Sequence, residues 1–406
     1  MGVKKLAALI LLGSALSLGA QDKPRRFVET GFDAGGSFAN SYLRTGDIFK
    51  EKITLDTSQM AGELGNGLAV MFDAHGEAFI NFNLGALWGI GFFVGMDSLG
   101  QFRIPQSMVE LLTEGNDPDK SYSDNLSIGA AAFLETGFWA SAKIRRIKFT
   151  IRPAYFLPLA YLSKPRANYA FAIKDDGSVT VAGNYRVEVY TPLPLNEIED
   201  FDDIGSLPGK IDVWDMFGKG GVDMVLRAEY PVYHNFTVGA SLGHIPLAPA
   251  RLTEKYSLSG DFEITKTLED IINNDFDLPD IDPVSEFDED HKMVFRPFKI
   301  GVDAVYRPFN IRLLTLRPEA ALVFNSVYDT PVYLDFGAAA ELNLGDIFML
   351  SAGTHLEDLV WKERAGLTLN FRIVEISAGI TTQSQQFLRS FQGAGFAVDV
   401  GVRLGF

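Results

Sequence analysis

The side chains that most often carry out catalysis or bind metals are sparse in this chain. Its 406 residues include no Cys and only five His, so disulfides and thiolate metal sites are absent. No H-E-x-x-H, G-x-S-x-G, phosphate-binding loop or dinucleotide fingerprint on a βαβ unit occurs, and no two His stand at metal-ligand spacing. The His are His75, His234, His244, His291 and His355. We therefore predict a protein that is not an enzyme and has no cofactor, although a site assembled from distant residues would leave no such motif.

One acidic segment carries enough carboxylates to suggest a metal site. Asp275, Asp277, Asp280 and Asp282 are followed by the acidic run 288–290, and oxygen atoms are the ligands that Ca²⁺ prefers. The spacing is not that of an EF-hand loop, and the Gly of such a loop is missing. Repulsion between like charges favours a solvated surface loop instead, so we predict no metal site.

Charged side chains of both signs recur at alternate positions within apolar sequence. Such positions share one face of a strand, and in a closed membrane barrel the polar face lines the interior. These charges either border a path for small molecules or pair with one another and fill a narrow lumen. The candidates for lining the lumen are Arg152, Arg186, Glu188, Arg227, Glu229, Asp303, Arg317, Glu319, Glu341, Arg372, Asp399 and Arg403.

The strands that would position these charges are clearest at the C-terminus, GFAVDVGVRLGF. Apolar residues occupy every even position from Phe396 to Phe406, whereas Asp399 and Arg403 fall on the opposite face. A strand of a soluble sandwich would alternate in the same way. Repetition of the pattern in segments of about ten residues, with aromatic residues near the segment ends, favours a membrane barrel.

The fold class that follows is all-β: a closed antiparallel transmembrane β-barrel of about 14–18 strands, with an even total. Long, partly helical loops are predicted near residues 41–66, 98–124, 191–218 and 265–296. Ser107 and its partner Glu110 have the spacing of a capping box and predict a short helix in the second of these loops. Such loops suit the extracellular side of a barrel, and one of them could instead fold inward as a plug.

The N-terminus has the layout of a secretory signal peptide. Lys4 and Lys5 precede the mostly apolar stretch Leu6–Leu18, and Ala20 provides a small residue before the expected cleavage. That stretch is shorter than the roughly 20 residues of a membrane helix, and no later apolar run is long enough for one. We predict a signal peptide over 1–20 and a barrel over 21–406. A formal net charge of −16 argues against a nucleic-acid partner.

The signal peptide, the alternating strands and the terminal VDVGVRLGF resemble those of bacterial outer-membrane β-barrel proteins, over nearly all of the mature chain. The resemblance implies a location in the outer membrane of a double-membraned bacterium, in contact with its lipid, and recognition of the C-terminal strand by the barrel-assembly machinery. In size and strand pattern the chain is also similar to the long-chain fatty-acid transporter family, whose barrel is closed by an N-terminal hatch. The segment FANSYLRTGD contains Asn40 but not the Asn-Pro-Ala of that hatch.

Two classes of function follow from these features. The first is a channel or transporter for a small-molecule cargo that the sequence does not identify. The second is a surface-exposed structural or adhesive barrel, which does not transport and binds a partner through its acidic loops. A continuous open lumen would favour the first, and a plugged lumen with ordered outward loops would favour the second.

Overall fold

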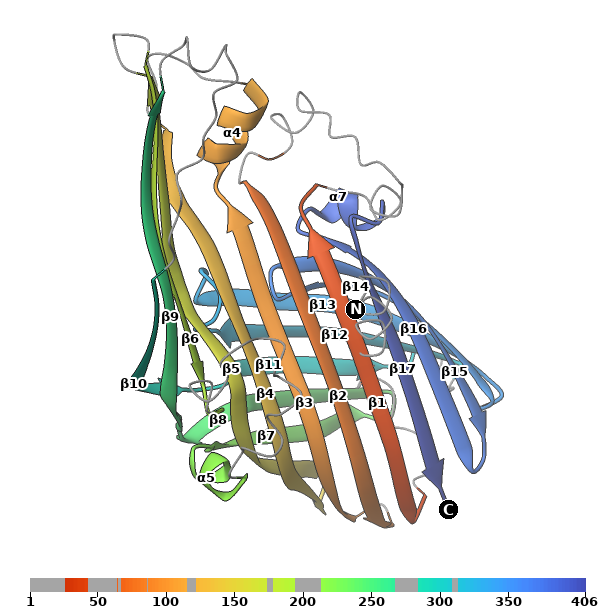
Figure 1. Ribbon diagram of the computed structural model, residues 1–406. Coiled ribbons are helices and arrows are strands. Elements are labelled where there is room, and N and C mark those ends of the chain that lie inside the picture. Colours follow the sequence, from red (N-terminus) through yellow and green to blue (C-terminus); the bar gives the residue numbers. More distant parts are fainter. Residues whose placement is uncertain are drawn as a thin grey trace.

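The computed structural model describes residues 26–42, 64, 67–85, 87–114, 122–173, 178–193, 213–266, 284–308 and 313–406. Within this part of the chain, all strands belong to one sheet of 17 strands (Figure 1). The described helices are α4 (Gln106–Glu114), α5 (Val213–Gly218) and α7 (Phe387–Ser390), and none of them is long and apolar enough to cross a membrane. The predicted signal peptide at 1–20 lies outside the described residues.

The strands follow one another along the chain with short turns at one end of the sheet and, for the most part, longer connections at the other (Figure 1). In chain order they are β1 (Val28–Asn40), β2 (Leu68–Leu84), β3 (Trp88–Ile104), β4 (Tyr122–Ile144), β5 (Ile147–Ile173), β6 (Val179–Thr191), β7 (Gly221–Tyr233), β8 (Phe236–Ala248), β9 (Ala250–Lys266), β10 (Val284–Val294), β11 (Phe298–Tyr306), β12 (Leu314–Phe324), β13 (Val332–Leu344), β14 (Phe348–Glu357), β15 (Val360–Phe371), β16 (Val374–Ser384) and β17 (Gly395–Gly405).

The sheet closes on itself because β1 pairs with both β2 and the last strand, β17. From β1 the ladder runs through β2, β3, β4 and β5, continues through β7, β8 and β11, and returns through β12 to β17. Every pairing is antiparallel, so closure requires an even number of strands. The odd total arises because β6, β9 and β10 lie outside this circuit. The predicted all-β fold, a closed antiparallel barrel of 14–18 strands, is confirmed.

The three additional strands extend one side of the wall. β5 is 27 residues long; its first half pairs with β7 and its second half pairs with β6. β6 and β7 therefore both lie beside β5, β7 along its first half and β6 along its second half. Residues 192–220 separate the two strands in the sequence. In the same way β8 leads into β9 across Pro249 alone, and β10 leads into β11 across 295–297. We call β6, β9, β10 and the second half of β5 the upper wall; it rises at the left of Figure 1.

Side chains are distributed over the circuit in the opposite way to a soluble protein. Val302 and Ile380 are 59% and 65% exposed, whereas Asp335 and Asp399 are 8% and 7% exposed. A chain in water would bury the aliphatic side chains and expose the carboxylates. Apolar side chains facing outward and charges facing inward suit a wall surrounded by lipid, as the alternation in the sequence predicts.

The long connections differ in detail from the sequence prediction. Helix α4 forms where a short helix is predicted, but the Ser107 hydroxyl bonds Tyr169 (2.6 Å) and Asp124 (3.2 Å) rather than capping the helix through Glu110. Residues 284–294, placed by the sequence in a long loop, form β10, because β9 supplies a partner for their backbone groups. Asp275, Asp277, Asp280 and Asp282 lie outside the described residues.

Candidate functional site

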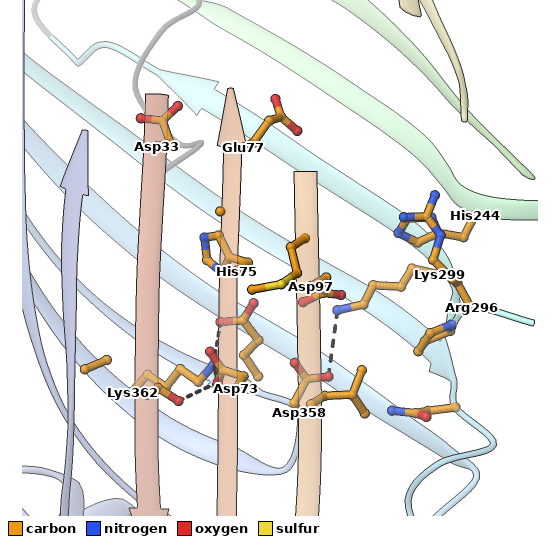
Figure 2. A pocket seen from close by; sticks show the side chains of 18 of the residues that line it. Asp33, Asp73, His75, Glu77, Asp97, His244, Arg296, Lys299, Asp358 and Lys362 are labelled. Atoms are coloured by element: carbon orange, nitrogen blue, oxygen red, sulfur yellow. Dashed lines mark hydrogen bonds and ion pairs between the residues drawn. The ribbon is translucent and has the colours of Figure 1, made fainter. Parts of the chain in front are cut away.

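The interior of the barrel holds a cavity of about 580 Å³ whose walls are charged (Figure 2). It is bordered by strands on all sides of the circuit, from β1 and β2 across to β15 and β17. The acidic residues of this cavity, which we call the central cavity, outnumber the basic ones. They are Asp33, Asp73, Glu77, Asp97, Glu135, Glu319, Glu357, Asp358 and Asp399, against Arg152, Arg296, Lys299, Lys362 and Arg364, with His75 and His244.

One side of the central cavity is organised by Arg296, which lies in the short link between β10 and β11. Its guanidinium donates to both carboxylate oxygens of Asp223, at 2.6 and 2.7 Å, and to Glu135 on β4. Arg152 on β5 binds Glu135 from the other side, at 3.2 Å, and also binds Glu77. Two guanidinium groups thus hold three carboxylates, from β2, β4 and β7, in a fixed arrangement, which keeps this wall polar without leaving a buried charge unpaired.

The other side is organised by two lysines. Lys299 lies 3.3 Å from Asp335 and 3.8 Å from Asp358, and Lys362 lies 3.5 Å from Asp73. Figure 2 shows the last two ion pairs reaching across the space between strands. Because each ammonium contacts two or more carboxylates, it can exchange partners by rotating its flexible stem. A polar solute entering the cavity therefore meets charged groups that are able to rearrange.

A second cavity of about 290 Å³ continues from the first toward β8, β11 and β12. Lys299, Glu319 and Glu357 border both cavities, so the two spaces adjoin. In the second cavity Arg227 bonds Asp303 at 2.8 Å, and His355 lies 3.0 Å from Glu319. Among the described residues, no group of His, Asp or Glu is arranged to hold a metal ion.

The sequence candidates for lining the lumen separate into four groups of three. Arg152, Glu319 and Asp399 border the central cavity, and Arg227, Asp303 and Arg317 border the second one. Three more form ion pairs: Glu229 with Arg227 at 3.0 Å, Glu341 with Arg317 at 3.7 Å, and Arg403 with Asp33 at 3.4 Å.

The remaining candidates lie elsewhere. Arg186 and Glu188 pair at 3.2 Å on β6, in the upper wall. Arg372 is in the turn between β15 and β16, with a positive φ of 68°. Alternation within a strand does not mark where the strand ends. Arg372 continues the even-numbered series of inward-facing residues of β15, but it lies beyond the end of the strand, in the turn.

Several cavity residues are not among the sequence candidates. Lys362 and Arg364 stand at alternate positions in WKERAG, and that period could have identified them. Arg296 lies between two strands in a Pro-flanked link, where no periodicity applies. Only its contacts with Asp223 and Glu135, distant in sequence, reveal that it belongs to the site.

Toward the end with the longer connections, the lumen is filled by apolar side chains. On β2 Met71 lies nearer that end than Asp73, and on β4 Phe133 lies nearer it than Glu135. These residues belong to one buried group, which we call the apolar cluster. Its members are Ala39, Met71, Leu99, Ala131, Phe133, Phe156, Tyr161, Tyr190, Ala250, Leu252, Val294, Val323, Val327, Tyr328, Tyr333 and Val360.

Two members of the apolar cluster come from the connection between β12 and β13, residues 325–331, which we call the plug loop. Val327 and Tyr328 are only 2% and 3% exposed. On the far side of the lumen, Asp329 accepts a hydrogen bond from Ser127 of β4. The plug loop therefore folds inward and reaches across the lumen at the level of the apolar cluster.

Comparison with known proteins supports the fold. No protein-family model matches the sequence, and no curated protein matches it. Among solved structures, the toluene transporter TbuX of Ralstonia pickettii is 8% identical with a TM-score of 0.50; the match covers 97% of this chain and 95% of that one.

Two further structures also match over most of their length. The monoaromatic hydrocarbon channel CymD is 8% identical with a TM-score of 0.49, and the match covers 98% of this chain and 96% of that one. A FadL homologue from Pseudomonas aeruginosa is 10% identical with a TM-score of 0.46, with coverages of 94% and 90%. At such identities the likeness is one of fold alone: the chain has a closed β-barrel fold similar to that of TbuX.

Proposed function

We propose that the protein is an outer-membrane transporter for small molecules. The observation that supports this most strongly is the charged cavity of about 580 Å³ inside a closed wall whose outer surface is apolar. A barrel that served only as a scaffold could fill its interior with side chains, as small barrels do. Here the interior retains space for a solute and charges that can bind one.

Two classes of cargo deserve separate tests. The structures with a similar fold are named as carriers of toluene and monoaromatic hydrocarbons, so aromatic hydrocarbons come first by analogy of fold. The central cavity itself is lined mainly by carboxylates, guanidinium groups and ammonium groups, which suit polar solutes. Uptake of toluene and of small charged solutes into liposomes containing the purified barrel would separate these cargoes.

The charged lining gives a direct test of passage through the lumen. Asp73→Asn removes one negative charge from the central cavity, so we expect the ratio of cation to anion permeability in planar bilayers to fall. Asp215→Asn makes the same chemical change on α5, where the side chain is 67% exposed, and should leave the ratio unchanged. Equal effects of the two variants, or no current from any form of the protein, would count against the proposal.

A second function has an observation in its favour. The plug loop reaches across the lumen within the apolar cluster, and the upper wall projects beyond the circuit with β10 paired to β9. An ordered projecting sheet above a closed lumen suits a barrel that binds a partner at the cell surface. The second function replaces the first if two results are obtained: the barrel never conducts, and cells whose barrel lacks the upper wall no longer adhere to surfaces or to other cells.

A further inference from the structure

We propose that the plug loop, residues 325–331, is a reversible gate that closes the lumen by latching onto β4. The inference rests on the proposed transport function and adds its regulation: the structure describes the closed state, and release of the latch opens the path between the central cavity and the end of the barrel with the longer connections. Three sets of contacts support it, one within the loop, one across the lumen and one toward the cavity.

The plug loop has a fixed shape of its own. The Asn325 backbone N–H donates to the Pro331 carbonyl at 2.8 Å, which closes the base of the loop. The Asn325 side chain accepts from the Val327 N–H at 2.9 Å and donates to the Tyr333 hydroxyl at 3.2 Å. A loop held together internally can move as a unit about its two strand ends, rather than unravelling when it leaves the lumen.

The contacts of the plug loop across the lumen are a side-chain hydrogen bond and apolar packing, both of which can break and reform. Ser127 donates to Asp329, and the Val327 carbonyl lies against Gly129, where β4 has no side chain. Among the described residues, no backbone ladder joins the plug loop to β4, whereas β4 is joined to β3 and β5 by long ladders, of which the one with β5 is interrupted between Leu126 and Ala130. The latch is therefore one hydrogen bond and one apolar surface, and its loss leaves the wall intact.

The plug loop is also connected to the charged groups beneath it. Tyr328 borders the central cavity and stacks on Tyr333, with ring centroids 6.2 Å apart. The Tyr333 hydroxyl donates to Asp358 at 2.6 Å, and Asp358 in turn lies 3.8 Å from Lys299. A solute that binds Asp358 or Lys299 pulls Asp358 away from the Tyr333 hydroxyl. Tyr333, on which Tyr328 of the plug loop stacks, then loses the hydrogen bond that holds its ring in place. Occupation of the cavity from below thus favours release of the plug loop.

The latch can be locked covalently. Because the chain contains no Cys, the double variant Ser127→Cys/Asp329→Cys introduces the only two thiols of the protein. We expect a disulfide, or a short bis-thiol bridge, to form in the folded barrel and to lower solute flux in liposomes roughly tenfold, with full recovery on reduction. Each single cysteine variant is the control and should show no dependence on redox conditions.

The latch can also be wedged open. A methyl group at Gly129 would overlap the Val327 carbonyl, so Gly129→Ala should displace the plug loop and raise flux roughly tenfold above the unmodified barrel. Gly218→Ala adds the same methyl group at the end of α5, where no atom lies within 4 Å, and should change nothing. Circular dichroism and heat-modified mobility on gels would verify that each variant folds.

The outcomes separate the gate from the transport function. If the cysteine pair cannot be bridged, or if bridging and Gly129→Ala leave a conducting barrel unchanged, the gate is wrong and transport stands. If the folded Gly129→Ala barrel and the reduced cysteine barrel pass neither ions, toluene nor charged solutes, the proposed transport fails, and the gate fails with it. Redox-dependent flux together with a more permeable Gly129→Ala barrel supports both.

Discussion

The guanidinium of Arg296 lies between two carboxylates in the barrel wall, and its side chain is only 3% exposed. Removing one partner of a buried ionic group leaves the others without compensation, which costs more than the pair contributes to stability. Asp223, which is 2% exposed, and Glu135 would both lose a donor if Arg296 were replaced. At the scale of single residues, these inward charges are therefore structural as well as lumen-lining.

We predict that Arg296→Met lowers the free energy of unfolding by about 3–5 kcal/mol, because the buried Asp223 loses both of its guanidinium bonds and Glu135 keeps only Arg152. Arg186→Met, in a pair whose Arg side chain is 58% exposed, should cost less than about 1 kcal/mol. Urea titration in detergent micelles, followed by the gel mobility of the folded barrel, measures both. Similar losses for the two variants would mean that the Arg296 cluster is not the buried network described here.

At the scale of elements, the alternation of the strands fixes which residues meet lipid. On β15, Leu367 is 40% exposed on the outer surface, whereas its neighbour Thr368 lies on the inward face together with Lys362 and Arg364. Because the side-chain period is two, a shift of one residue would exchange these faces along the whole strand. Substitutions at adjacent positions therefore test the register of β15 directly.

We predict that Leu367→Arg costs about 2–4 kcal/mol of barrel stability, since it places a charge on the lipid face. Thr368→Arg should cost much less, because water and the ionic groups of the lumen are available to the guanidinium. Folding into lipid vesicles at increasing urea concentrations compares the two variants. A larger loss for Thr368→Arg would show that the two faces of β15 are assigned the wrong way round.

At the scale of the whole molecule, closure depends on the last strand. β17 pairs with β16 on one side and with β1 on the other, so it joins the two ends of the chain into a ring. Without it, β1 and β16 would present unpaired backbone groups to lipid, and no water is available there to satisfy them. The stability of the barrel therefore depends on a segment of 11 residues at the end of the chain.

We predict that deletion of residues 395–406 abolishes insertion into the outer membrane and leaves aggregated or degraded protein. The reason is the open sheet edge, together with the proposed loss of the strand that the assembly machinery recognises. Outer-membrane fractionation and resistance of the barrel to added protease provide the measurement. Normal amounts of protected, membrane-inserted protein after the deletion would contradict the pairing of β1 with β17.

The sequence by itself determined the fold class and the two faces of the wall. Period-two alternation is a local property: Asp399 and Arg403 oppose an unbroken row of apolar residues, and the repetition of this pattern along the chain favours a wall between lipid and a polar interior. The strands, the range for their number and the short helix near Ser107 follow from the same local patterns.

Only the tertiary structure decided what the interior contains. The latch joins Ser127 and Asp329, which are 202 residues apart, and the Arg296–Glu135 contact spans 161 residues. Such contacts depend on which strands face each other across the lumen, and this depends on closure, tilt and stagger of the whole ring rather than on any local pattern. The same dependence explains why residues 284–294 form β10: only the neighbouring β9 supplies partners for their backbone groups.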